Sequence, residues 1–223
     1  MLFPELLSQL NMEKYLQSSK IIDWQNPEIL ELAHRLGLTC QTTEEIAKVC
    51  FEWVRDEIYH SRDYQMNPVT CRASDVLKYK TGYCFAKSHL LAALLRANQI
   101  PAGLCYQRLT IDDPLESKLT SNNIPCTLHG LNATFLPNIG WYRVDSRGNR
   151  DGVDAQFIPP QEQLAFEIKL PQEANFAGVL AEPLPVVVQV LEQCKTWEEV
   201  LLSVPDISLE SALMTGLTHH PIV

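Results

Sequence analysis

One cysteine stands where its thiol could act as a nucleophile. Cys84 follows Gly82-Tyr83 and opens an apolar run that is typical of a buried helix. The first turn of a helix presents unpaired N–H groups and the positive end of the helix dipole, which favour thiolate over thiol. Gly82 permits a tight bend before this helix. We predict that Cys84 is a nucleophile whose own backbone N–H helps to bind an oxyanion. The alternative is a buried structural cysteine, the usual role of Cys in a core.

His129 is the candidate general base. It lies in a strand-like stretch, where a period of two puts it on one face with Leu131, Ala133 and Phe135. That face is apolar, so we expect His129 to point inward, toward the helix that begins at Cys84. There a neutral imidazole can take the thiol proton. The alternative is a core histidine without a catalytic role.

Asp145 is the candidate group that orients His129. On the next strand it can accept a hydrogen bond from the imidazole and fix its tautomer, or it can pair with Arg143 or Arg147. The register of the hairpin decides between these roles. Pairing of Leu131 with Asp145 puts His129 diagonally next to Asp145 on one face, whereas a shift of one residue separates them. The sequence therefore predicts a three-residue hairpin loop, or a bulge.

The seven cysteines favour reduced thiols and a cytoplasmic location. Their number is odd, they form no Cys-x-x-Cys pair, and the first ten residues lack the basic start of a signal peptide. Cys126 and His129 form a Cys-x-x-His pair, but positions three apart on a strand point to opposite faces. The tail pair His219-His220 is expected to be disordered. We expect no metal and no cofactor, and no second cysteine lies near Cys84 to support a redox role.

Composition excludes several classes of partner. The chain has 223 residues, a net charge of −9 and no run of Lys and Arg, which argues against binding to nucleic acid or to an anionic membrane. The longest apolar run, Leu90 to Leu95, is far too short to span a bilayer. The length suits a single domain over residues 1–223. We expect a core at about 25–160, a helical extension at about 161–205 and a tail at 206–223.

Helical patterns fill the first half of the chain and strand patterns follow, which predicts an α+β fold. The expected helices start at Pro27 after Asn26, at the Thr42/Glu45 capping box, at a Ser74 cap and at Cys84, and in the extension at Pro183 and at a second capping box from Thr196 to Glu199. The expected strands cover 102–110, 127–136 and 141–146, with a turn at 137–140. The polar loop at 111–125 is long enough to act as a lid.

Several motifs together resemble the transglutaminase-like superfamily of papain-type cysteine enzymes, closest to microbial members of unassigned substrate. They are Phe51-Glu52-Trp53-Val54-Arg55-Asp56, Gly82-Tyr83-Cys84, the helical Leu-Leu-Ala-Ala-Leu-Leu-Arg-Ala, Ile100-Pro101-Ala102, His129, and Gly140-Trp141-Tyr142-Arg143-Val144-Asp145. The resemblance implies a papain/transglutaminase-like core, with helices on an antiparallel sheet and the catalytic Cys at a helix N-terminus. It also implies Cys84 as nucleophile, His129 as base and acid, and Asp145 as orienter.

The chain departs from the family pattern at two positions. Papain-like enzymes place an oxyanion-hole Gln six residues before the Cys, where this chain has Lys78, and eukaryotic transglutaminases follow the Cys with Trp, where it has Phe85. The second oxyanion donor is therefore unassigned. No Asp-x-Asp calcium loop is visible, so we do not expect calcium activation.

The leading hypothesis is a cysteine hydrolase or acyltransferase that acts on an amide or peptide bond through a thioester. Its partner is a peptide, protein or small amide substrate, and hydrolysis is favoured over crosslinking because nothing marks an amine site. The alternative is a catalytically silent transglutaminase-like module that binds a peptide or protein. The sequence leaves the oligomeric state open.

Overall fold

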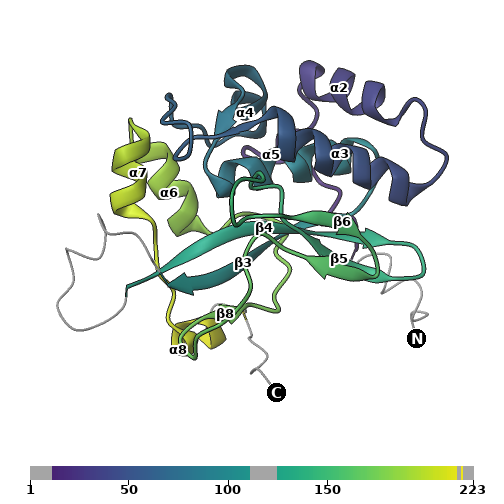
Figure 1. Cartoon of the computed structure of the whole chain (residues 1–223). Helices are drawn as coiled ribbons and strands as arrows, with labels where there is room; N and C mark the ends of the chain where they lie inside the picture. Colours follow the sequence, from purple (N-terminus) through teal and green to yellow (C-terminus); the bar gives the residue numbers. More distant parts are fainter. Residues whose placement is uncertain (1–11, 111–124, 215–216, 218–223) are drawn as a thin grey trace, which may run out of the picture.

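A layer of helices packs on one face of an antiparallel sheet (Figure 1). The structure is a computed structural model that describes residues 12–110, 125–214 and 217. The main sheet has the order β5-β4-β3-β8. Its strands are β3 (Ala102–Thr110), β4 (Cys126–Leu136), β5 (Gly140–Val144) and β8 (Ala174–Asn175). The observed fold is thus the predicted α+β arrangement of helices on an antiparallel sheet. The 111–125 lid lies outside the described residues except for Pro125, and the His219-His220 tail lies wholly outside them.

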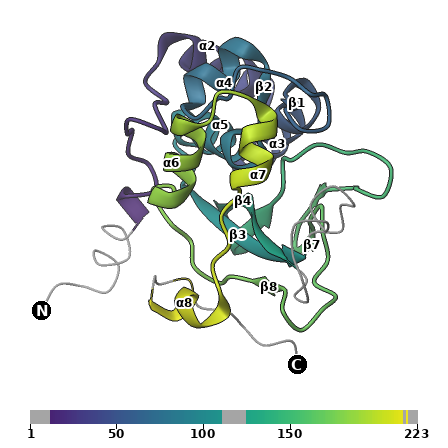
Figure 2. The ribbon, with the colours of Figure 1, turned by 90° about the vertical axis from the view of Figure 1, so that its left-hand side faces the viewer.

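Helix α5 (Cys84–Ala97) is the centre of the helical layer. Every residue from Cys84 to Arg96 is buried, as the all-round apolar pattern predicts. The helix contacts strands β3 and β4 below it and three further helices, and the second view shows it enclosed among them (Figure 2). The three helices are α2 (Pro27–Gly37), α3 (Thr43–Glu57) and α4 (Ala73–Tyr79). A first turn held so firmly gives Cys84 a fixed position.

Local capping explains where the surrounding helices begin. The Asn26 side chain accepts from the Glu28 N–H at the start of α2, and Thr42 and Glu45 form the predicted capping box of α3. The predicted cap of α4 is wrong, because α4 begins at Ala73 and Ser74 lies inside the helix. The Ser74 N–H and hydroxyl instead donate to the Asp23 carboxylate, at 3.0 and 2.6 Å.

The β4–β5 hairpin has the predicted register. Leu136 pairs with Gly140 and Asn132 with Val144, so three residues form the loop. Asn138 and Gly140 adopt positive φ angles of 67° and 88°, as a tight hairpin turn requires. The paired region ends at Val144, one residue earlier than needed to include Leu131 and Asp145. If this register continued for one more residue, Asp145, which directly follows β5, would lie opposite Leu131 of β4.

The segment after the hairpin differs from the predicted helical extension. Residues 161–184 contain no helix; they carry β7 (Gln161–Gln163), which pairs with β6 (Gln156–Ile158), and β8, which adds a fourth strand to the main sheet. Helices resume with α6 (Pro185–Gln193), α7 (Trp197–Ser203) and α8 (Leu209–Met214). At α7 the expected capping box is incomplete: Thr196 accepts from the Glu199 N–H, but the Glu199 carboxylate accepts from Lys195.

Within the described residues, no helix combines the length and apolar character needed to cross a bilayer.

Candidate functional site

Cys84 is the first residue of α5, and its side chain lies in the wall of a cavity of 1170 Å³. Two short parallel strands, β1 (Tyr59–His60) and β2 (Thr81–Gly82), hold the chain immediately before it. A Cβ at Gly82 would approach the Ala86 Cβ to 3.0 Å and the Thr70 Oγ1 to 3.2 Å. The glycine therefore allows the close packing that feeds the chain into the helix.

Gly130 brings the histidine strand against the start of the cysteine helix. A Cβ at this position would lie 2.6 Å from the Phe85 Cδ1 and 3.1 Å from the Phe85 Cα. Because Gly130 follows His129 and Phe85 follows Cys84, the contact places the His129 and Cys84 side chains next to each other. Sequence reasoning missed this residue, although a glycine inside a strand pattern is a known sign of close backbone approach.

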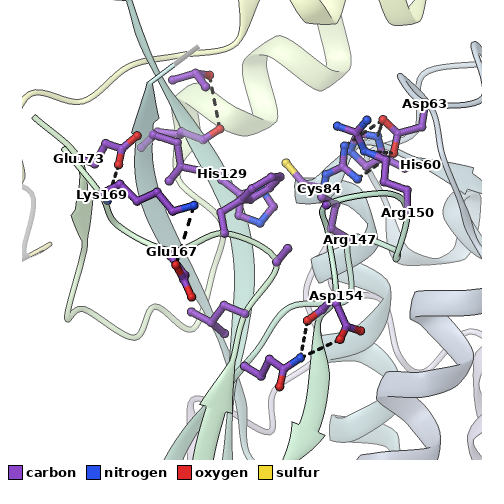
Figure 3. A pocket seen from close by; sticks show the side chains of 18 of the residues that line it. His60, Asp63, Cys84, His129, Arg147, Arg150, Asp154, Glu167, Lys169 and Glu173 are labelled. Atoms are coloured by element: carbon purple, nitrogen blue, oxygen red, sulfur yellow. Dashed lines mark hydrogen bonds and ion pairs between the residues drawn. The ribbon is translucent and has the colours of Figure 1, made fainter. Parts of the chain in front are cut away.

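The face of β4 that packs on α5 is not the one that the sequence predicted, although His129 does lie beside Cys84 (Figure 3). The residues of β4 that pack on α5 are even-numbered: Gly130 contacts Phe85, and the Asn132 amide donates to the Ser88 carbonyl at 2.9 Å. Leu131 and Ala133 instead belong to a smaller apolar cluster with Cys105. Both faces of β4 are covered, so an apolar face alone could not show which one meets the helix.

His129 meets the site because the edge of β4 is open there. Strand β5 pairs with β4 only as far as Asn132. Beyond that point the Cys84 side chain lies beside the His129 ring (Figure 3). The His129 Nε2 lies 2.7 Å from the Asp145 Oδ2, so Nδ1 is the nitrogen available to Cys84. Phe166 packs edge-on against the ring, with centroids 5.1 Å apart.

Asp145 is fully buried and accepts three hydrogen bonds. Besides the His129 bond, its oxygens accept from the backbone N–H groups of Arg147 and Ala165, each at 3.1 Å. Burial raises the pKa of this carboxyl, but the His129 charge and the three hydrogen bonds outweigh burial and hold the pKa below its ordinary value. The two arginines that could have paired with it bind other carboxylates: Arg143 binds Glu162, and the Arg147 guanidinium binds Asp63.

The electrostatics of the site favour the protonated imidazole. Burial lowers the pKa of His129, yet the negative charges of Asp145 and of a Cys84 thiolate, together with their hydrogen bonds, raise it to about 10. A buried His held between two anions is therefore stabilised as imidazolium.

A basic cluster borders Cys84 on the side away from His129 (Figure 3). Arg147 donates two hydrogen bonds to the Asp63 carboxylate, at 2.8 and 2.9 Å. Arg150 lies 3.6 Å from the same carboxylate. The His60 Nδ1 lies 3.7 Å from Asp63 and has no hydrogen-bond partner. None of these residues was predicted as part of the site, because their positions in the sequence give no sign that they meet.

Lys87, one helical turn after Cys84, is buried below the site. Its ammonium donates to the carbonyls of Ile58 and Arg55 at the end of α3, at 3.2 Å for Arg55. Burial, followed by the charge of Arg147, lowers the pKa of Lys87 to about 7. The lysine caps a helix C-terminus and does not line the cavity.

Lys78, at the position of the family's oxyanion-hole Gln, is exposed on α4, where its ammonium lies over the Tyr79 ring. It does not line the cavity. Among the described residues, no group of three or more potential metal ligands gathers at one place. At the Cys126–His129 spacing, the Nε2 of His129 is already bound by Asp145.

The fold and the site together define a papain-like arrangement, with a cysteine at a helix N-terminus beside a histidine and an aspartate on an antiparallel sheet. The family model of the transglutaminase-like superfamily matches residues 31–146, just over half of the chain, and ends one residue after Asp145. The chain belongs to the transglutaminase-like superfamily.

Several solved structures are similar to this chain at low sequence identity. One, described as a putative cysteine protease from Cytophaga hutchinsonii, is 16% identical with a TM-score of 0.47, and the match covers 61% of this chain and 42% of that one. The periplasmic domain of TgpA from Pseudomonas aeruginosa is 19% identical with a TM-score of 0.45, over 62% of this chain and 47% of the other. Each match thus spans less than half of the length of the solved structure. No curated protein sequence matches the chain.

Proposed function

We propose that this protein is a cysteine hydrolase or acyltransferase that acts on amide or peptide bonds through a thioester on Cys84. In this proposal His129 is the general acid and base, and Asp145 orients it. The observation that carries the proposal is the buried His129, which is bound to Asp145 through Nε2 at 2.7 Å and turns its other nitrogen to Cys84. An orienting carboxylate, a base and a nucleophile in one chain of hydrogen bonds are the parts that acyl transfer needs.

The chemistry proceeds in two steps. The Cys84 thiolate attacks the carbonyl carbon, the C–N bond breaks, and the His129 imidazolium gives its proton to the departing amine. The carbonyl oxygen becomes negative in between, and the unpaired N–H groups in the first turn of α5 are placed to bind it. His129, now neutral, takes a proton from water or from an amine, whose attack on the thioester releases the acyl group. We favour hydrolysis, since no feature of the described cavity marks a site for an amine.

The alternative function is a silent binding module that uses the cavity to hold a peptide or protein. The observation in its favour is the exposed Lys78, which leaves the usual position of the second oxyanion donor unfilled. The presence of all three triad side chains at one place, with His129 bound to Asp145 at 2.7 Å, favours the enzyme. For location we propose the cytoplasm, because all seven cysteines are free thiols.

Pre-steady-state kinetics with an activated ester test the proposal. Wild-type protein mixed with excess 4-nitrophenyl acetate is expected to release a burst of nitrophenol equal to the enzyme, followed by slower turnover. Cys84→Ala is expected to abolish the burst. Cys194→Ala is the matched control, because Cys194 is a partly exposed free thiol after α6 that does not line the cavity. A wild-type protein without a burst between pH 6 and 9 would favour the binding module.

A further inference from the structure

The end of the cavity beyond Cys84 carries an excess of positive charge. We call it the arginine end and define it by His60, Arg62, Asp63, Arg147 and Arg150, all of which line the cavity. Among these residues three arginines accompany a single carboxylate. The chain as a whole has a net charge of −9, so a basic wall is unusual on this protein. A charged wall inside a concave site concentrates its field on whatever enters.

Arg147 binds both oxygens of the single carboxylate, Asp63. Its side chain is 5% exposed, and both terminal nitrogens bind the two Asp63 oxygens in parallel, at 2.8 and 2.9 Å. Such a two-bond pair is geometrically complete and neutral as a unit. Asp63 therefore offsets the charge of Arg150 only in part, although it lies 3.6 Å from that side chain.

Arg150 presents its charge to the cavity. Its Nε lies 3.6 Å from the Asp63 Oδ2, beyond hydrogen-bond distance, and its side chain is 54% exposed. The next carboxylate along the wall, Asp154, accepts hydrogen bonds from the Asn149 amide at 3.2 Å and the Gln163 amide at 3.0 Å. Arg150 thus lines the cavity with a guanidinium that no described carboxylate binds through a hydrogen bond.

His60 reports the same field. Burial, and then the positive charges of Arg147, Lys87, His129 and Arg62, hold its pKa well below the ordinary value. The His60 ring packs at a tilt against Tyr83, the residue that precedes Cys84, with ring centroids 5.0 Å apart. Positive potential therefore reaches the position where the substrate meets the nucleophile.

The opposite end of the cavity differs in charge. There the Glu167 and Lys169 side chains lie 3.9 Å apart, and the Glu173 carboxylate accepts from the Thr110 hydroxyl at 2.6 Å (Figure 3). The arginine end is thus a local feature of one wall.

We infer that the arginine end binds a carboxylate of the substrate, so that the acyl compound is an acidic peptide or amide with a carboxylate close to the scissile bond. A planar guanidinium matches a carboxylate with two parallel hydrogen bonds and discriminates against a neutral amide of the same shape. The inference rests on the proposed function and names the substrate class of the same site.

Alkylation of Cys84 by a matched pair of reagents tests the inference without a known substrate. In both iodoacetate and iodoacetamide the thiolate displaces iodide, and the reagents differ in carrying a carboxylate or a neutral amide. Rates are measured on the Cys84 peptide by mass spectrometry, which separates it from the other thiols. We expect Arg150→Gln to lower the ratio of the iodoacetate rate to the iodoacetamide rate about fivefold. The ratio is the readout because an effect of the substitution on the thiolate itself changes both rates alike.

Matched variants make the test specific. Arg62→Gln is expected to lower the ratio as well. Arg72→Gln is expected to leave it unchanged, because Arg72 is a half-exposed arginine paired with Asp23 at 2.9 Å and does not line the cavity. In the wild type, raising the salt from about 20 mM to about 0.5 M should lower the ratio, since the Debye length then shortens to a few ångströms.

The outcomes separate the two proposals. A ratio that is equal in wild type, Arg150→Gln and Arg62→Gln, or that ignores salt, overturns the carboxylate site even if the acyl-enzyme burst appears. A ratio that responds to both arginines supports the carboxylate site even if no burst appears, and in that case the acyl-transfer proposal is the one that fails.

Discussion

Replacing Asp145 by Asn tests what the buried carboxylate does for the nucleophile. The rise of the His129 pKa from 6.5 to about 10 corresponds to roughly 5 kcal/mol in favour of the imidazolium, at about 1.4 kcal/mol per pKa unit. Asp145 and Cys84 supply this together, so removing the Asp145 charge removes part of it. The thiolate that depends on the imidazolium becomes scarcer, and we expect alkylation of Cys84 by iodoacetamide at pH 6.5 to slow by about ten- to a hundredfold.

The same substitution has a structural cost that can be measured separately. Asp145 Oδ2 accepts from His129 and Ala165, and Oδ1 accepts from the Arg147 N–H. An Asn that keeps its oxygen toward His129 turns its NH₂ group toward the Arg147 N–H, which leaves a buried donor unpaired at a cost of about 1–3 kcal/mol of unfolding free energy. Urea unfolding measures this loss.

The assay is the alkylation rate of the Cys84 peptide between pH 5 and 9. Asp154→Asn is the control, because Asp154 lines the same cavity and bonds to Asn149 and Gln163 instead of His129. The result that refutes the reasoning is an Asp145→Asn protein that is folded and alkylated at the wild-type rate across this range.

Three further predictions follow from the contacts around the site. Gly130→Ala puts a Cβ 3.1 Å from the Phe85 Cα, so we expect the β4 strand to move away from the helix. Alkylation of Cys84 should become slower, and urea melts should show a loss of about 1–3 kcal/mol in the free energy of unfolding. Lys87 has a folded pKa of about 7, below its ordinary 10.5, so the unfolded chain binds its proton more strongly. Its contribution makes stability rise with pH from about 7 to about 10.5, and Lys87→Met should remove this rise in urea melts at several pH values. Arg147→Met leaves Asp63 without its bidentate partner and should cost about 3–5 kcal/mol of stability, much of it recovered when Asp63→Asn is added.

The pH dependence of stability separates His129 from Lys87. The folded pKa of His129 is raised, so its stabilising contribution is complete below about 6.5 and is lost as the pH rises toward about 10. Lys87 acts in the opposite direction over an overlapping window. A comparison of each single variant with wild type at every pH isolates the two contributions.

Much of the site could be predicted because it depends on local patterns. The start of α5 at Cys84 follows from the glycine, the tyrosine and the apolar run, and the three-residue loop follows from turn chemistry. Register then brings His129 and Asp145 together, since pairing in a hairpin is fixed by its loop.

The rest depends on contacts between distant segments. The face of β4 that packs on α5 was predicted incorrectly because the segment after β7 covers the second face of the sheet, so both faces are buried. The arginine end joins residues near 60 to residues near 150, and nothing in either stretch specifies the other. The predicted helical extension was wrong over residues 161–184, which pair as strands or cover the sheet.

The most direct test of the account is the mass of the protein after acid quenching during turnover of an activated ester. We predict one added acyl group, which peptide mapping assigns to Cys84, in the wild type, and none in Cys84→Ala. His129→Ala should form the adduct more slowly and also lose it more slowly. In the wild type, an adduct on another residue, or no adduct although the ester is turned over, would contradict the role given to Cys84.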